Sequence, residues 1–181
     1  ITPWNFPIAI PFWHMAVALV EGNTVVWKPA EQTPKCGYII AKIMDKIDIP
    51  DGVFNLVQGY GDVGSNIVNS DRVSTVLFTG SAEVGQEIQK QAVNDPSKSV
   101  ACEMGGKNSM IITDQADIEL GVKCAILSSF KTTGQRCVST ERIIVHSDIY
   151  NEFKNQFINL AKSIEVGDPL DENTFMGQLI D

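Results

Sequence analysis

Short β-branched runs alternate with segments of helical periodicity along most of the chain, and this alternation limits the possible folds more than any other feature. The expected strands are 24–27, 53–57, 73–78, 100–103, 109–112 and 142–145. The expected helices are 11–20, 33–47, 62–68, 81–93, 117–130 and 147–164. Strands that alternate with helices at this spacing form βαβ units around a parallel sheet. The sequence therefore predicts an α/β fold with a doubly wound parallel sheet.

Individual residues mark where several of these helices begin, end or become buried. Ser81 and Ser147 precede helices and are expected N-caps, because a serine oxygen accepts a backbone N–H there. Gly22 follows the 11–20 helix and is expected to end it. That helix carries apolar residues on most of its faces, which predicts that it is buried.

The composition indicates a folded protein without a nucleic-acid or membrane partner. The chain has 181 residues, and the 44% that are hydrophobic are enough for a sizeable core. Its net charge of −8 disfavours nucleic-acid binding, because phosphate neutralisation needs clustered Lys and Arg. The longest apolar stretch, 6–20, is interrupted by prolines and is too short to span a bilayer. Both ends, at Ile1 and Asp181, have the character of cuts through a longer protein, so we expect an internal fragment.

The four cysteines indicate neither a disulfide framework nor a metal site. They form no C-x-x-C pair and lie far from both histidines in the sequence, so we expect no metal. A reducing, cytoplasmic location is the matching prediction. For Cys36, Cys102 and Cys124 we expect buried structural thiols.

Two glycine-rich turns occur where an expected strand meets an expected helix. Gly59, Gly61 and Gly64 form a literal G-x-G-x-x-G, and Gly80 and Gly85 repeat the pattern after the next strand. Such turns let a pyrophosphate approach unpaired N–H groups at a helix N-terminus. Glycines also serve ordinary tight turns, so the pattern alone leaves a nucleotide site and a structural turn as equal alternatives.

Lys28 and Glu31 follow the end of the 24–27 strand. Ligands of open α/β sheets bind at the carboxyl ends of strands, so this pair could hold the hydroxyls of an adenosine ribose. A surface ion pair is the alternative interpretation.

Cys137 lies in a loop between an expected helix and an expected strand. Arg136 precedes it and would favour the nucleophilic thiolate form. The alternative is a buried structural cysteine. Arg136 itself could attract an anionic group on a substrate or take part in an ion pair.

Three further polar residues have both a chemical and a structural interpretation. Glu103 ends an apolar strand, where a buried carboxylate could serve as a general base or form an ion pair. Asn5 lies between aromatic residues and prolines, where a rigid amide could donate to an oxyanion or occupy a turn. We interpret His14 and His146 as structural.

Together these residues resemble the NAD(P)-dependent aldehyde dehydrogenase superfamily. The resemblance covers the whole chain in unbroken order. Its motifs are Pro3-Trp4-Asn5-Phe6-Pro7, Trp27-Lys28-Pro29-Ala30-Glu31, Phe78-Thr79-Gly80-Ser81, Val84-Gly85, Glu103-Met104-Gly105-Gly106-Lys107-Asn108 and Gly134-Gln135-Arg136-Cys137.

The resemblance implies a catalytic role for three residues. Cys137 would attack the aldehyde and carry a thiohemiacetal and then a thioester. Asn5 and the Cys137 backbone N–H would stabilise the oxyanion. Glu103 would activate the water that hydrolyses the thioester.

The resemblance also implies a cofactor site for NAD, with NADP possible. Its residues would be Trp4, Lys28, Glu31, Gly61, Gly80, Ser81 and Gly85. In this family the literal G-x-G-x-x-G borders the adenine, and the turn at Gly80 and Ser81 holds the pyrophosphate. Glu31 should repel a 2′-phosphate, which favours NAD.

The domain organisation follows from the resemblance. Residues 1–104 would form an incomplete cofactor-binding, Rossmann-like domain, and residues 105–181 the first part of an α/β catalytic domain. The family's oligomerisation hairpin and its Glu-x-Phe-Gly-Pro segment are not in this sequence. The parent protein is expected to be a homo-dimer or homo-tetramer.

The expected activity is oxidation of an aldehyde to a carboxylic acid. One alternative is a CoA-acylating semialdehyde dehydrogenase, in which CoA replaces water as the acceptor. Another is a catalytically inactive nucleotide-binding fragment. The sequence does not identify the aldehyde.

Overall fold

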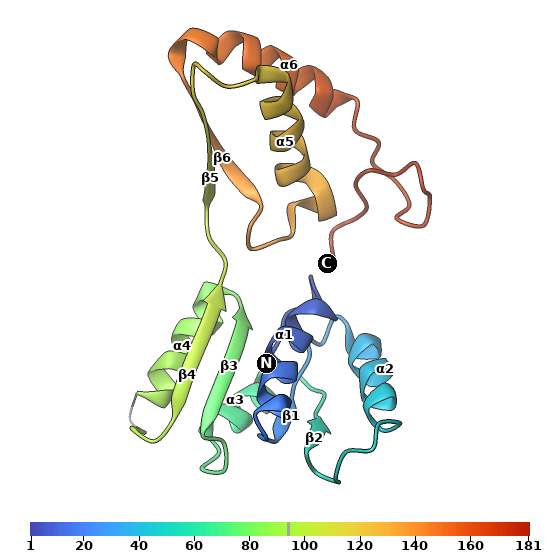
Figure 1. The fold of residues 1–181 in the computed structure, drawn as a ribbon, viewed down its shortest axis with the longest axis vertical. Coiled ribbons are helices and arrows are strands. Elements are labelled where there is room, and N and C mark those ends of the chain that lie inside the picture. Colours follow the sequence, from blue (N-terminus) through green and yellow to red (C-terminus); the bar gives the residue numbers. More distant parts are fainter. Residues whose placement is uncertain (94) are drawn as a thin grey trace. The chain divides into compact units, whose positions relative to one another are not determined.

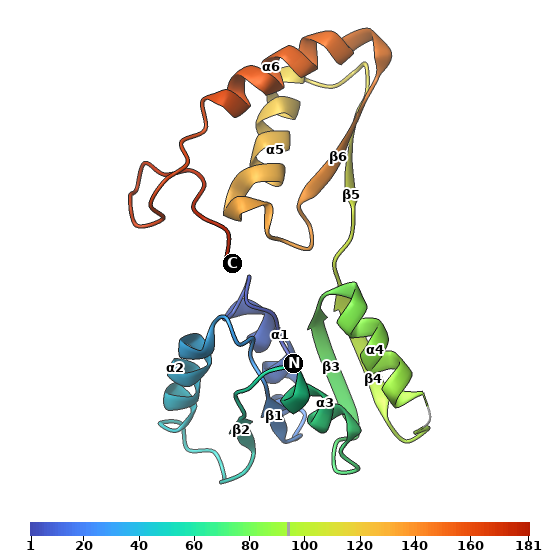
Figure 2. The same ribbon diagram turned by 180° about the vertical axis from the view of Figure 1, so that it is seen from behind.

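The computed structural model describes residues 1–93 and 95–181, and the chain divides into two compact units. The first unit is Ile1–Met104 and the second is Gly105–Asp181. Figures 1 and 2 show the strands and helices of each unit from two sides.

The first half of unit 1 is built on a parallel βαβ motif. Strands β1 (Val25–Trp27) and β2 (Phe54–Leu56) pair in parallel, and helix α2 (Pro34–Met44) connects them. Helix α1 (Ala9–Val20) precedes β1. A core of Met15, Trp27, Ile40 and Met44 joins both helices to β1, since each of these side chains is at most 8% exposed.

The second half of unit 1 repeats the motif. Strands β3 (Thr75–Gly80) and β4 (Ser99–Met104) pair in parallel, and helix α4 (Ala82–Ala92) connects them. Helix α3 (Gly61–Asn69) precedes β3. A second core consists of Val68, Val76, Phe78 and Ile88. Figure 1 shows α4 (green) running alongside β3 and β4.

The first two residues of the chain connect the two halves of unit 1. The Ile1 nitrogen donates to the Leu77 carbonyl at 2.9 Å, and the Thr79 N–H donates to the Ile1 carbonyl at 3.1 Å. This pattern is that of a parallel ladder beside β3. On the other side, the Thr2 N–H donates to the Lys28 carbonyl at 3.2 Å. A short extended segment therefore lies between the ends of β1 and β3.

Unit 2 is a third parallel βαβ motif. Strand β5 (Asn108–Ile112), helix α5 (Ile118–Phe130) and strand β6 (Thr140–Val145) form it, and helix α6 (Tyr150–Lys162) follows. Two short 3₁₀ helices, η1 (Lys131–Gly134) and η2 (Ser147–Ile149), flank β6. Ile112, Val122, Ala125 and Phe153 form its core.

The predicted α/β class with parallel strands is confirmed, and several helix ends lie where single residues indicated. The Ser81 hydroxyl accepts the Val84 N–H at 3.3 Å and caps α4. Gly22 has a φ of 79° just after α1, which is the left-handed conformation that ends many helices. Within the described residues, no helix has the length and apolar character needed to cross a membrane.

Three expectations that concern helices are wrong. Helix α1 is buried on one face only, and Trp13 and Val17 on another face are 67% and 65% exposed. Ser147 does not cap α6, because η2 intervenes and the His146 ring accepts the Asp148 N–H instead. Cys124 is exposed, because α5 buries the face that carries Val122, Ala125 and Ile126.

Candidate active site

The predicted cofactor residues of unit 1 follow the ends of its parallel strands. Lys28 follows β1, Gly61 follows β2, and Gly80 and Ser81 end β3 and cap α4. The carboxyl ends of strands are where open α/β sheets bind ligands. The topology therefore gives these residues positions suited to a nucleotide.

The Lys28 ammonium is buried and pairs with a carboxylate. The residue is only 4% exposed, and Nζ lies 3.3 Å from Glu31 Oε2 and 3.2 Å from the Pro29 carbonyl. Glu31 is more accessible, with 39% of its side chain exposed. The predicted surface ion pair is thus half right: the pair forms, but its cation is inside the protein. A buried cation needs compensating oxygen atoms, and Glu31 is placed where it also meets solvent.

Close contacts require glycine at Gly59 and Gly85, but not at Gly61. Gly59 has a φ of 153°, and a Cβ there would lie 2.4 Å from Val63 Cγ2. Around a Cβ at Gly61 there is only open space. At Gly85 a Cβ would lie 2.5 Å from Met104 Sδ, so the missing side chain lets α4 approach β4 closely.

Glu103 lies opposite Thr79 in the β3–β4 register and is exposed. The expected burial of this carboxylate is therefore wrong. Side chains alternate across a strand, and the neighbours Cys102 and Met104 take the face that packs into the core. Glu103 faces the other way, where it is open to water.

His14 lies near Glu103 and is held by a hydroxyl. Its Nε2 is 3.0 Å from Thr79 Oγ1. Burial lowers the pKa of His14 and Glu103 partly opposes this; in the 181-residue chain as given, the terminal ammonium of Ile1 lowers it further. Trp4 and Asn5 are half-buried in the segment between Thr2 and α1. Unit 1 thus holds two of the three predicted catalytic residues.

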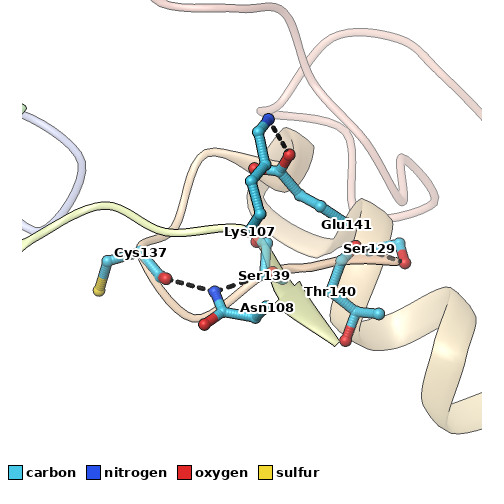
Figure 3. Close-up of polar contacts among 7 residues, drawn as sticks. All are labelled: Lys107, Asn108, Ser129, Cys137, Ser139, Thr140 and Glu141. Carbon is cyan, nitrogen blue, oxygen red and sulfur yellow. Dashed lines mark hydrogen bonds and ion pairs between the residues drawn. The ribbon is translucent and has the colours of Figure 1, made fainter. Parts of the chain in front are cut away.

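The predicted nucleophile, Cys137, lies in unit 2 on the loop between η1 and β6. It is exposed, which contradicts the alternative of a buried structural cysteine. Figure 3 shows the Asn108 amide beside the Cys137 carbonyl. Asn108 Nδ2 donates to the Cys137 carbonyl at 2.6 Å and to the Ser139 carbonyl at 3.1 Å. Sequence reasoning missed Asn108, although it ends one of the motifs that carried the resemblance.

Arg136 fixes the other side of the same loop. Its Nη2 donates to the Leu127 carbonyl at 3.0 Å and to the Ser128 carbonyl at 3.1 Å, in the last turn of α5. The Leu127 carbonyl also accepts the Lys131 N–H at the end of α5, so the guanidinium adds a second donor there and reinforces the helix end. Within the described residues Arg136 therefore binds backbone oxygens, and the predicted ion pair is not formed.

The turn before Cys137 has an unusual backbone. Thr132, Thr133 and Gly134 have φ values of 59°, 58° and 67°, all left-handed. Such conformations are costly for threonine and persist only where surrounding contacts hold them. Two contacts tie this turn to the C-terminal segment: Thr133 Oγ1 donates to the Gly177 carbonyl at 3.4 Å, and Gln135 Oε1 accepts the Ile180 N–H at 3.1 Å.

No metal site emerges from residues 1–93 and 95–181, in which no three His, Cys, Asp or Glu side chains gather as metal ligands would. The nucleotide fits the residues of unit 1 better. A buried cation, an accessible carboxylate and a capped helix N-terminus after a glycine all follow strand ends.

Comparison with known proteins decides the family. The aldehyde dehydrogenase family profile matches residues 1–181. This chain belongs to the aldehyde dehydrogenase family.

Its relatives include the α-ketoglutaric semialdehyde dehydrogenase of Bacillus subtilis, which is 46% identical over 99% of the chain and 37% of the relative. The 2,5-dioxopentanoate dehydrogenase of Saccharolobus solfataricus is 42% identical over 100% of the chain and 38% of the relative. The betaine aldehyde dehydrogenase of Brucella ovis is 42% identical over 99% of the chain and 37% of the relative.

Solved structures of the aldehyde dehydrogenase fold match equally well. PnpE in complex with nicotinamide adenine dinucleotide has a TM-score of 0.95 at 40% identity, over 99% of this chain and 37% of that one. A 3,6-anhydro-L-galactose dehydrogenase with bound NADP has a TM-score of 0.96 at 36% identity, over 99% of this chain and 38% of that one. The chain thus spans little more than a third of the length of the relatives it matches.

Proposed function

We propose that the parent protein oxidises an aldehyde to a carboxylic acid with NAD(P), and that Cys137 is its nucleophile. The observation that carries the proposal is the Cys137 loop: an exposed thiol on a turn that Asn108 and Arg136 hold to β5 and α5. Family membership over the whole chain supports the reaction class. In this proposal, residues 1–104 are an incomplete cofactor-binding domain and residues 105–181 are the start of the catalytic domain.

The dinucleotide would be held by unit 1. Lys28 and Glu31 would contact the adenosine ribose, Gly80 and Ser81 the pyrophosphate, and Gly61 the region of the adenine. Gly85 would keep α4 close to the sheet, and Trp4 would line the nicotinamide or substrate channel. Glu31 is accessible beside Lys28, so its charge would disfavour a 2′-phosphate and favour NAD. When bound, the nicotinamide supplies the acceptor for the hydride of the aldehyde.

The chemistry of the chain's own residues follows the usual order of covalent catalysis. The Cys137 thiolate attacks the carbonyl carbon, and the carbonyl electron pair moves onto oxygen. Asn5 and the Cys137 N–H would donate to that oxyanion. After loss of hydride, the carbon is a thioester on Cys137. Glu103, which is open to water, would take a proton as water attacks, and Cys137 would leave as the thiolate.

An aldehyde panel on the full-length parent tests this function. Two relatives are named for α-ketoglutaric semialdehyde and 2,5-dioxopentanoate, and one for betaine aldehyde. The assay therefore compares an anionic with a cationic aldehyde, follows NADH absorbance and identifies the product. A free acid is expected with or without CoA. An acyl-CoA product would establish the CoA-acylating alternative, and no NADH from any aldehyde would contradict the proposal.

Assembly and location belong to the same proposal. We expect the parent to be a homo-dimer or homo-tetramer, which light scattering of the purified protein measures. All four cysteines are free thiols, a state that the reducing cytoplasm maintains.

A further inference from the structure

The Asn108 side chain, at the start of β5, donates hydrogen bonds to the backbone of the loop before β6. Its amide nitrogen donates to two carbonyls, at Cys137 and Ser139, which lie on either side of Val138. Figure 3 shows both contacts converging on one nitrogen. An amide can donate in two directions at once, so a single side chain spans the loop before β6.

This part of the loop precedes the paired residues of β5 and β6. Asn108 pairs with Thr140, but the next pair is Ser109 with Arg142, because the register shifts at this point. Thr140 is the first residue of β6, so Cys137 and Ser139 lie outside the strand. The Asn108 side chain, at the start of β5, supplies the N–H groups that the Cys137 and Ser139 carbonyls accept.

The contact between the Asn108 amide and the Cys137 carbonyl fixes the orientation of the backbone at Cys137. A carbonyl fixed at 2.6 Å fixes the peptide plane that follows Cys137. Val138, the next residue, is 66% exposed and therefore gives the loop no anchor in the core. Ser139 is 3% exposed and marks where the buried chain resumes. The Ser139 N–H also donates to the Arg136 carbonyl at 3.1 Å and closes the turn around Cys137. The Asn108 amide is the side chain that contacts the Cys137 carbonyl itself.

We propose that Asn108 is a positioning residue that orients Cys137 for attack on the aldehyde. The inference rests on the proposed function of Cys137 and adds a residue to which the reaction had assigned no role. Misplacing a nucleophile by about an ångström can cost on the order of a hundredfold in rate. Asn108 acts through the Cys137 carbonyl, so its loss should lower kcat and leave cofactor binding unchanged.

The test uses the full-length parent with three variants. Asn108→Ala removes the amide, and Asn108→Asp keeps its shape but replaces both N–H donors with an acceptor. Glu141→Gln is the matched control, because it disrupts the exposed Lys107–Glu141 ion pair at the same end of the β5–β6 pair. The kcat is expressed per Cys137 thiol titrated with iodoacetamide and mapped by mass spectrometry, which removes any effect of misfolded protein.

Asn108→Ala should lower kcat per titrated thiol by about 10- to 100-fold, with the KM of the aldehyde and the Kd of NAD within about twofold. Asn108→Asp should be at least as impaired, and Glu141→Gln should match the wild type. A kcat within about twofold of wild type in Asn108→Ala, or an equal loss in Glu141→Gln, would overturn the inference.

Two further variants distinguish a failure of the Asn108 inference from a failure of the proposed function. If Asn108→Ala does not fold, Asn108→Ser replaces it; a single hydroxyl donor should give a smaller loss of about 3- to 10-fold, and full activity would contradict the positioning role. Cys137→Ser tests the proposed function itself. Turnover that survives Cys137→Ser refutes the nucleophile, whereas a dead Cys137→Ser with fully active Asn108 variants refutes only the role of Asn108.

Discussion

Cys137 and Cys124 are both exposed thiols of unit 2, and their surroundings separate them. Cys124 lies on a regular helix, whereas Cys137 follows three left-handed residues and has its carbonyl fixed by Asn108. Cys137→Ser in the parent should therefore abolish aldehyde oxidation, because a hydroxyl is a far weaker nucleophile than a thiolate. NAD binding, followed by fluorescence, should survive. Cys124→Ser is the control and should keep its turnover; an active Cys137→Ser would refute the assignment.

Glu103 illustrates how exposure can suit a catalytic role. A carboxylate in contact with water is placed to activate it, without the cost of burying a charge. Glu103→Gln should thus slow hydrolysis of the thioester more than hydride loss. Stopped-flow absorbance should show a burst of NADH followed by near-arrest, since acyl-enzyme accumulates. If burst and steady state fall together, Glu103 acts earlier in the reaction.

At the scale of elements, the end of β3 depends on a glycine. A Cβ at Gly80 would lie 2.5 Å from Phe78 Cζ, and the Phe78 ring is only 4% exposed. Gly80→Ala should therefore lower the free energy of unfolding by about 1–3 kcal/mol, because a packed ring must move. Gly61→Ala is the matched control, since nothing lies within 4 Å of its added Cβ. Urea unfolding measures both, and equal stabilities would show that the Phe78 ring yields freely.

Elements whose signals are local could be predicted from the sequence. The alternation of β-branched and helical segments predicts β3, α4 and α5, and Ser81 marks the start of α4. Features that depend on distant partners could not be predicted. The exposure of Glu103 follows from which face of β4 packs into the core, and the role of the Asn108 amide follows from a register shift between strands about 30 residues apart.

The same limit applies to the candidate site. Motif resemblance assigned catalytic roles to Cys137, Glu103 and Asn5 without any geometry, because a family pattern carries chemistry in residue type and order, and these roles remain predictions. The resemblance gave Arg136 no structural role. Arg136 contacts two carbonyls at the end of α5, and only the fold determines where that helix end lies. Lys28 was assigned to a ribose contact, but its burial is a property of the packed unit.

At the scale of the whole molecule, the 181-residue chain by itself should not oxidise aldehydes measurably. It spans about 37% of the B. subtilis relative, so most of a family member of that length lies outside this chain. Catalysis requires nucleophile, base and hydride acceptor to be held within well under an ångström. NADH absorbance with the mass-verified chain is the measurement, and the full-length parent is the positive control. Robust turnover by the 181-residue chain would contradict this expectation.

The amino group of Ile1 should give the 181-residue chain a pH-dependent stability. Burial, with help from the nearby Lys28 ammonium, lowers the pKa of this group from 8.0 to about 5. The unfolded chain therefore binds more protons than the folded chain between those two values, so stability should rise as the pH rises from about 5 to 8. The full shift corresponds to at most about 4 kcal/mol. His14, whose pKa is also lowered, changes stability in the same direction.

Acetylation of Ile1 isolates this contribution. The acetylated nitrogen keeps an N–H that can donate to the Leu77 carbonyl, but it carries no charge at any pH. A cavity of about 310 Å³ is lined by Ile1 together with residues of α1, β1 and β3, and we expect the added acetyl group to enter it. Urea unfolding of both forms at pH 5, 6.5 and 8 should show a steeper rise for the free amine, with acetylation most stabilising at pH 5. Parallel curves would mean that the folded chain leaves the Ile1 ammonium in contact with water.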